Sequence, residues 1–160
     1  MTEPVAGVVL IVATTAVGLM AGVFGLYANT IMRGLGRTDD RTFVGAFQAI
    51  DRAIINPLFL STFFAALIVT GVAAVLHLDE DVLPWIGAAF ALYLVGLVIT
   101  FAVNVPLNDA IKAAGEPDAI DDLAGVRARF DEERWSRWNL VRALVTLASF
   151  VCLACALALR

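Results

Sequence analysis

The segment Trp135–Arg142 reads Trp-Ser-Arg-Trp-Asn-Leu-Val-Arg and leads into an apolar run, Leu144–Leu159. At helical spacing, four of its side chains share one face: Trp135, Trp138, Asn139 and Arg142. An arginine inside a membrane span is energetically costly, so it usually faces the protein interior and a polar partner. The segment therefore predicts a membrane helix that packs against others. We expect the partners of Arg142 in the polar segment Thr100–Asp109, at the end of an earlier apolar run.

The composition supports a membrane protein. Of the 160 residues, 61% are hydrophobic and 16% are charged, whereas soluble domains are about 45–50% apolar. A membrane helix needs about 20 apolar residues, and four runs qualify, at about 5–32, 54–78, 83–105 and 140–159. We predict an all-α, integral membrane four-helix bundle with cytoplasmic amphipathic helical extensions, forming one domain over residues 1–160.

The basic residues predict the orientation in the cell membrane. Four lie between the first and second runs, and six lie between the third and fourth runs or at the start of the fourth. Only Arg160 lies on the other side. By the positive-inside rule, both long loops are cytoplasmic and both termini are extracytoplasmic. The first run has no Lys or Arg before it and is too long for a signal-peptide core, so we expect it to remain as a span.

Three features are predicted at the cytoplasmic ends. Thr42–Ile55 has the apolar stripe of an amphipathic helix, which would lie at the interface or under the bundle. Pro106 cannot donate to the carbonyl of Ala102, so that carbonyl needs another partner. A second helix, Pro117–Arg137, has no helix breaker after Gly125, and we expect it to continue into the last span as one long helix.

Polar and aromatic side chains from all four runs converge at this end and form the candidate site. They are Tyr27, Asn29, Gln48, Asp51, Arg52, Asn56, Asn104, Asn108, Asp109, Trp135, Trp138, Asn139 and Arg142. Such a cluster in a helical bundle can hold a planar, partly polar ligand. The competing interpretation is purely structural, because Asn and Arg also form hydrogen bonds between membrane helices or extend to the lipid headgroups.

Several chemistries are disfavoured. The single histidine, His77, lies in the short outer loop, so a paired-histidine haem or a Glu-x-x-His di-iron site is not available. Cys152 and Cys155 lie within the last span, where they are best interpreted as small buried apolar residues. The sequence has no phosphate-binding glycine loop, no Gly-x-Ser-x-Gly motif and no basic patch for nucleic acid.

Two motifs together resemble the anthrone oxygenase-like family of four-span membrane proteins, whose bacterial members are mostly domains of unknown function. They are Asn104-Val105-Pro106-Leu107-Asn108 and Arg134-Trp135-x-x-Trp138-Asn139-x-x-Arg142. The segments Gly18–Gly25 and Phe43–Gln48 are also similar to the family. The resemblance covers nearly the whole chain.

The resemblance implies cofactor-independent oxygenation of an anthrone- or quinone-like aromatic substrate by molecular oxygen. Such a reaction requires a group that accepts a proton and a group that stabilises an oxyanion. On this basis we expect Arg142 to hold the oxyanion and Asn104, Asn108 and Asn139 to orient the substrate. Substrate contacts are expected from Trp135, Trp138, Asn29 and Gln48.

Several questions stay open at this point. Either Asp109 or Asp51 could be the general base. The alternative function is a non-catalytic membrane protein that binds a lipid or small molecule, or an accessory subunit of a membrane complex. The expected partners are a small aromatic or lipid-like molecule and membrane lipids, with homo-oligomerisation left open.

Overall fold

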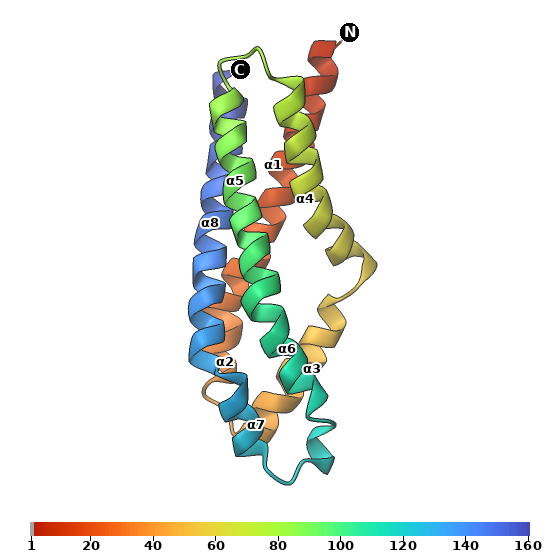
Figure 1. Ribbon diagram of the computed structural model, residues 1–160, viewed down its shortest axis with the longest axis vertical. Helices are drawn as coiled ribbons and strands as arrows, with labels where there is room; N and C mark the ends of the chain where they lie inside the picture. The colour runs from red at the N-terminus through yellow and green to blue at the C-terminus, as the bar shows by residue number, and fades with distance from the viewer. Residues whose placement is uncertain (1) are drawn as a thin grey trace.

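The computed structural model describes residues 2–160, and helices are the only regular elements in that range (Figure 1). The longest are α1 (Thr2–Leu26), α4 (Pro57–Leu76), α5 (Leu83–Ile99) and α8 (Glu132–Leu159). The shorter α-helices are α2 (Met32–Leu35), α3 (Asp40–Ile54), α6 (Val105–Ala113) and α7 (Leu123–Phe130). Two π-helices, η1 (Tyr27–Ile31) and η2 (Thr100–Asn104), and the 3-10 helix η3 (Pro117–Ala119) complete the set.

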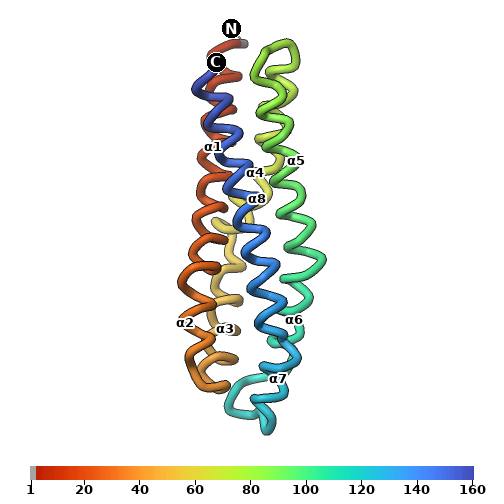
Figure 2. The backbone as a smooth tube through the Cα atoms, turned by 90° about the vertical axis from the view of Figure 1, so that its left-hand side faces the viewer, coloured from red at the N-terminus to blue at the C-terminus, as the bar shows by residue number. Residues whose placement is uncertain are grey.

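Four helical stretches are long and apolar enough to cross a membrane: Glu3–Leu35, Pro57–Leu76, Leu83–Ala113 and Leu123–Leu159. α1 packs against α4 and α8, and α5 packs against the same two helices. The four therefore close into a bundle, which confirms the predicted all-α membrane fold. Both termini and the α4–α5 connection lie at one end, and α3, α6 and α7 lie at the other (Figures 1 and 2).

Small residues bring the four helices close together. Four alanines, one from each long helix, have no exposed surface: Ala13, Ala66, Ala89 and Ala156. Small side chains let membrane helices approach closely, and interhelical hydrogen bonds add to the packing. Tyr93 Oη donates to the Phe63 carbonyl at 2.9 Å, and Ser149 Oγ donates to the Ala89 carbonyl at 2.7 Å. These two hydrogen bonds join α5 to α4 and α8 to α5 inside the bundle.

The predicted amphipathic helix is present as α3. Asp39 caps its first turn by accepting a hydrogen bond from the Thr42 backbone N–H at 3.0 Å, as expected of an aspartate in this position. The apolar stripe is buried at Phe43 and Phe47. These rings pack against Phe130 of α7, at centroid distances of 5.7 and 4.5 Å. α3 therefore folds under the bundle rather than projecting from it.

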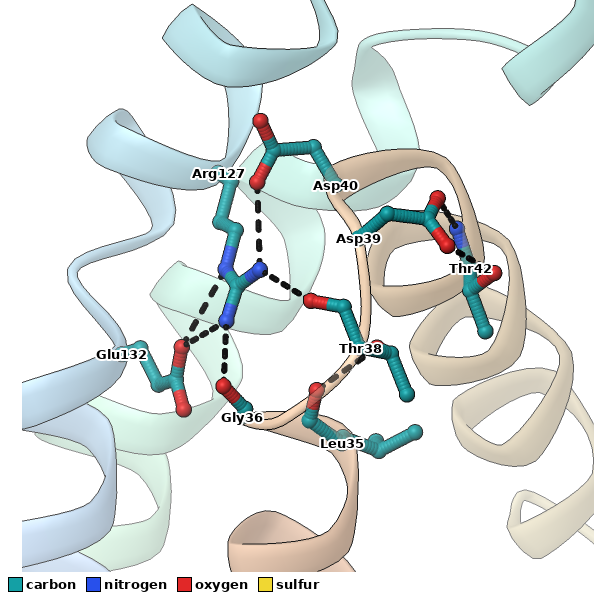
Figure 3. Close-up of polar contacts among 8 residues, drawn as sticks. All are labelled: Leu35, Gly36, Thr38, Asp39, Asp40, Thr42, Arg127 and Glu132. Atoms are coloured by element: carbon teal, nitrogen blue, oxygen red, sulfur yellow. Dashed lines mark hydrogen bonds and ion pairs between the residues drawn. The ribbon is translucent and has the colours of Figure 1, made fainter.

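Arg127 of α7 fixes the turn that leads into α3 (Figure 3). Its guanidinium donates to the carbonyls of Thr38 at 2.9 Å and Gly36 at 3.2 Å. It also pairs with the carboxylates of Asp40 at 3.1 Å and Glu132 at 2.9 Å. A single side chain thereby joins α7, the start of α8 and the α2–α3 turn.

The expected continuous helix from Pro117 into the last span is wrong. The chain leaves helical geometry after Ala119, and again at Asp131, which has a positive φ of 54°. Two aspartates start new helices at these breaks. Asp122 accepts from the Gly125 N–H at 2.8 Å, and Asp131 accepts from the Arg134 N–H at 3.1 Å. Aspartate is a strong N-cap, and this competing signal decides the local structure.

The two π-helices widen the first and third spans. The N–H of Val105 bonds to the Thr100 carbonyl, five residues back, in the turn just before Pro106. The predicted disturbance at Pro106 is therefore absorbed by a π-turn rather than by a free carbonyl facing lipid. π-turns inside α-helices occur frequently at functional sites. Both of these, η1 and η2, contact α8.

Candidate functional site

A cavity of about 270 Å³ lies between α1, η1, α3, α4, η2, α6 and α8, toward the end of the bundle that carries α3. Its wall is rich in aromatic side chains. Six phenylalanines contribute: Phe24, Phe47, Phe59, Phe63, Phe64 and Phe101. The polar groups on the wall are Tyr27, Asp51, Thr100, Asn108, Trp135 and Arg142. An apolar pocket with a few polar groups is the usual form of a small-molecule site.

Arg142 is buried at one side of this cavity, with 6% of its surface exposed. Its Nη1 donates to Thr100 Oγ1 at 3.1 Å, so its partner lies in the segment that the sequence predicted. Its Cζ lies 4.1 Å from the centroid of the Phe24 ring, in a cation–π arrangement. Among the described residues, no carboxylate pairs with Arg142, and its Nε has no hydrogen-bond partner. A buried positive charge therefore faces the cavity without a counter-ion.

Asn139 orients the guanidinium of Arg142 without bordering the cavity. Its Oδ1 accepts from Arg142 Nη2 at 2.6 Å, and its Nδ2 donates to the Phe24 carbonyl at 3.2 Å. Asn139 is fully buried and does not border the cavity. It acts on a ligand only through Arg142, so it is a positioning residue.

A second hydrogen-bonded chain crosses the cavity wall from α8 to α3. Trp135 Nε1 donates to Asn108 Oδ1 at 2.7 Å, and Asn108 Nδ2 donates to Asp51 Oδ1 at 2.7 Å. Lys112 Nζ lies 2.8 Å from the other oxygen of Asp51 and 3.1 Å from Asp109 Oδ1. The amide of Asn108 must turn its oxygen toward the indole and its nitrogen toward the carboxylate. The chain therefore fixes Asp51 at the cavity wall.

The structure brings five residues of the predicted cluster to the cavity, namely Tyr27, Asp51, Asn108, Trp135 and Arg142. Asn104 is buried behind them, where its Nδ2 donates to the Trp135 carbonyl at 3.4 Å. Of the two candidate bases, Asp51 borders the cavity, whereas the Asp109 side chain is 64% exposed and does not.

Three predicted substrate contacts lie elsewhere. Gln48 is buried beneath the bundle, where its Nε2 donates to the carbonyls of Ile111 and Gly115. Asn29 is exposed and bonds to the neighbouring Thr30 hydroxyl. Trp138 is partly exposed and is not part of the cavity wall. The structure therefore gives these three no contact with the cavity.

Sequence reasoning missed most of the apolar wall. Phe24, Phe59, Phe63 and Phe101 belong to helices that are apolar all round, so hydrophobic periodicity does not distinguish their inner face from the lipid face. The polar wall residue Thr100 could have been predicted from the sequence, because it is the first residue of the segment in which the partner of Arg142 was expected.

These features define a multi-pass membrane protein with a buried arginine in an aromatic cavity. The family model for anthrone oxygenase matches residues 43–152, more than half of the chain, and the chain belongs to this family. The matched range includes Asp51, Asn108, Trp135 and Arg142, and begins after Phe24. No curated protein and no solved structure matches the chain.

Proposed function

We propose that this protein is a cofactor-independent oxygenase that oxidises the central methylene of an anthrone-like substrate to a quinone carbonyl. The observation that carries the proposal is the uncompensated guanidinium of Arg142 in an aromatic cavity, which suits a planar ligand that develops an oxyanion. Preorganised donors aimed at such an oxygen are the largest single contribution in many enzymes. Membership of the anthrone oxygenase family supports the same reaction.

The size of the cavity supports a ligand larger than one ring. A cavity of about 150 Å³ holds benzene in an engineered protein core, and the cavity here is about 270 Å³. Aromatic walls favour offset-stacked or edge-to-face contacts with a planar ligand. A fused two- or three-ring substrate is consistent with these dimensions.

The reaction needs no external reductant. Asp51 accepts a proton from the methylene carbon, and the electron pair moves to the ketone oxygen, which Arg142 stabilises as an enolate. The enolate gives one electron to O₂, and the two radicals combine at carbon to form a peroxide, which takes up the proton. Loss of the remaining C–H proton cleaves the O–O bond. The products are one water molecule and the quinone carbonyl, so atoms and electrons balance.

Asp51 is the preferred base because it is the carboxylate on the cavity wall. In an anthrone, the methylene and the ketone lie at opposite edges of the central ring, so the base and the oxyanion group must come from different walls. Asp51 comes from α3 and Arg142 from α8. The bonds from Asn108 and Lys112 would hold the carboxylate in one orientation during proton transfer.

The proposed orientation places the site at the cytoplasmic side. The basic residues of the α2–α3 and α6–α8 connections lie at the end of the bundle with the cavity, which the positive-inside rule favours for the cytoplasm. Both termini would then be extracytoplasmic. A reporter fused to the C-terminus would be active only outside the cytoplasm, and a cytoplasmic signal would contradict this orientation.

The test is oxygen uptake by the purified protein in detergent with a small panel of anthrones. We expect uptake above the spontaneous rate, with formation of the anthraquinone. Arg142→Met should lower kcat by about 10²–10³-fold, as expected for loss of an oxyanion donor. Asp51→Asn should lower it by about 10²–10⁴-fold, as expected for loss of a general base. The matched controls Arg160→Met and Asp109→Asn alter the same residue types outside the cavity and should retain the wild-type rate.

One observation favours a second function. The carboxylate of Asp51 is already engaged by Asn108 and Lys112, an arrangement that would also suit a static binding site. The alternative is therefore a non-catalytic protein that binds a small aromatic or lipid-like anion. Tight binding of a hydroxyanthraquinone without oxygen uptake from any anthrone would favour this alternative.

A further inference from the structure

The cavity has a buried polar side and an exposed apolar side. Three of its polar wall residues are nearly inaccessible: Asp51 and Arg142 are each 6% exposed and Trp135 is 2% exposed. In contrast, four apolar residues of the same wall are strongly exposed, namely Ile55, Leu60, Phe64 and Phe101. We define these four residues as the rim. A ligand that reaches Arg142 from the rim passes only apolar side chains.

Three of the four rim residues belong to candidate membrane spans, and Ile55 lies just before one of them. Leu60 and Phe64 belong to the candidate span Pro57–Leu76, and Phe101 belongs to the candidate span Leu83–Ala113. α4 and α5 adjoin near the α4–α5 connection and separate toward the end that carries α3 (Figure 1). The cavity therefore opens between α4 and η2, on the outer surface of two helices that contact lipid.

The wall toward α6 is closed by polar contacts. The chain from Trp135 through Asn108 to Asp51 and Lys112 is continuous, with donor–acceptor distances of 2.7, 2.7 and 2.8 Å. A ligand arriving from that direction would have to break charge-assisted hydrogen bonds, which are stronger than neutral ones. The rim offers no such obstacle.

We propose that the cavity opens laterally into the bilayer and that its ligand is a membrane-dissolved polycyclic aromatic with one ionisable oxygen. The ionisable oxygen lies at Arg142 and the carbon opposite it lies at Asp51, while one terminal ring stays at the rim, beside the lipid acyl chains. This inference rests on the proposed function for the ligand's role as substrate. It adds a rule for its chemistry: the terminal ring at the rim carries hydrogen or alkyl groups and no charged substituent.

The rule has a physical basis. A charged group held at the rim would sit in the hydrocarbon region, where charge is costly. An alkyl group there would contact acyl chains and the exposed rings of Phe64 and Phe101. A ligand of this class also concentrates in the bilayer, so its local concentration at the rim exceeds that in water.

The experiment measures binding rather than turnover. The protein is reconstituted in phosphatidylcholine vesicles and mixed with an alkylated hydroxyanthraquinone, whose absorbance reports association. We expect Phe101→Trp and Leu60→Trp, which narrow the opening, to slow association about tenfold, since restricted access acts on the association rate. The control Val72→Trp lies on the exposed face of α4, away from the cavity, and should associate at the wild-type rate.

A second probe, the same hydroxyanthraquinone sulfonated on the terminal ring that faces the rim, should bind at least about tenfold more weakly, a difference of about 1.4 kcal/mol. Three results would overturn the proposal: unchanged association in both rim variants, equal affinity for the sulfonated probe, or no binding by folded wild-type protein. The failure of the oxygenase proposal looks different. In that case binding would depend on the rim, but no anthrone would give oxygen uptake.

Discussion

Replacement of Asn108 by leucine tests whether the chain from Trp135 to Asp51 serves the reaction. Leucine has a similar size but accepts and donates no hydrogen bonds. The change removes two contacts of 2.7 Å and leaves the indole N–H and one carboxylate oxygen without these partners. A neutral hydrogen bond contributes about 1 kcal/mol, and one to a charged group about 1.5–3 kcal/mol. We therefore expect the free energy of unfolding to fall by about 3 kcal/mol.

The same contacts hold Asp51 and Trp135 at the cavity wall. If they are needed in the transition state, a loss of about 3 kcal/mol lowers kcat/KM by about a hundredfold, since each 1.36 kcal/mol is a factor of ten. The assay combines thermal unfolding in detergent with oxygen uptake per folded protein. This normalisation separates lost activity from lost protein.

Gln48→Met is the matched control. Gln48 also makes two buried hydrogen bonds, of 2.7 and 3.0 Å, but it lies outside the cavity. It should lose a similar amount of stability and keep the wild-type kcat/KM. The reasoning is refuted if Asn108→Leu loses stability yet retains full kcat/KM, because the chain would then be only a contact between helices.

Three further predictions concern two residues outside the cavity wall and the absence of a metal requirement. Asn139→Leu removes the 2.6 Å bond that orients Arg142 and should lower kcat/KM about tenfold, which corresponds to about 1.4 kcal/mol of transition-state stabilisation. The control Asn29→Ala changes an exposed side chain and should not alter oxygen uptake. Equal rates for both variants would contradict a positioning role for Asn139. Arg127→Met removes the contacts with both carboxylates and both carbonyls. Because these contacts are partly exposed, it should lower the free energy of unfolding by about 2 kcal/mol, with kcat/KM per folded protein unchanged. Thermal unfolding and limited proteolysis at the α2–α3 turn measure the effect, and wild-type stability would disprove it. Dialysis against a chelator should leave oxygen uptake unchanged, as the family's cofactor-independent chemistry implies; a loss of rate restored by a divalent metal would contradict it.

The helical bundle could be predicted from the sequence because length and composition decide it. Runs of about 20 apolar residues with charges confined to their ends leave membrane helices as the main solution. The inward direction of Arg142 followed from the energetic cost of exposing a guanidinium to lipid. Its contact with Thr100 fell in the segment where polar partners were expected.

The parts that could not be predicted depend on competition between helix-start signals within one segment and on which face of a helix points into the bundle. Asp122 and Asp131 cap new helices and break a segment whose apolar pattern alone favoured one helix. On α8, the buried face includes Trp135, Asn139 and Arg142. At about 100° per residue, Trp138 lies about 60° from Trp135, at the edge of this face. Residue spacing alone therefore could not decide that it turns away from the cavity.

The aromatic residues of the cavity wall could not be predicted from the sequence for a different reason. The spans are apolar on every side, because lipid and the bundle interior both accept phenylalanine. Only the packing of α3 under the bundle and the separation of α4 from η2 create the cavity, and both are tertiary features. The residues that carry charge or hydrogen bonds were therefore predictable, whereas those that shape the ligand were not.

The most direct test of the proposed oxygenase is the origin of the new oxygen atom. Purified protein in detergent is given an anthrone under ¹⁸O₂, and the quinone is analysed by mass spectrometry beside Arg142→Met. The proposed oxygenase mechanism requires that the wild type rapidly forms a quinone with one ¹⁸O atom from O₂, and that Arg142→Met forms it only at the spontaneous rate. Equal rates in the wild type, the variant and protein-free buffer would contradict it.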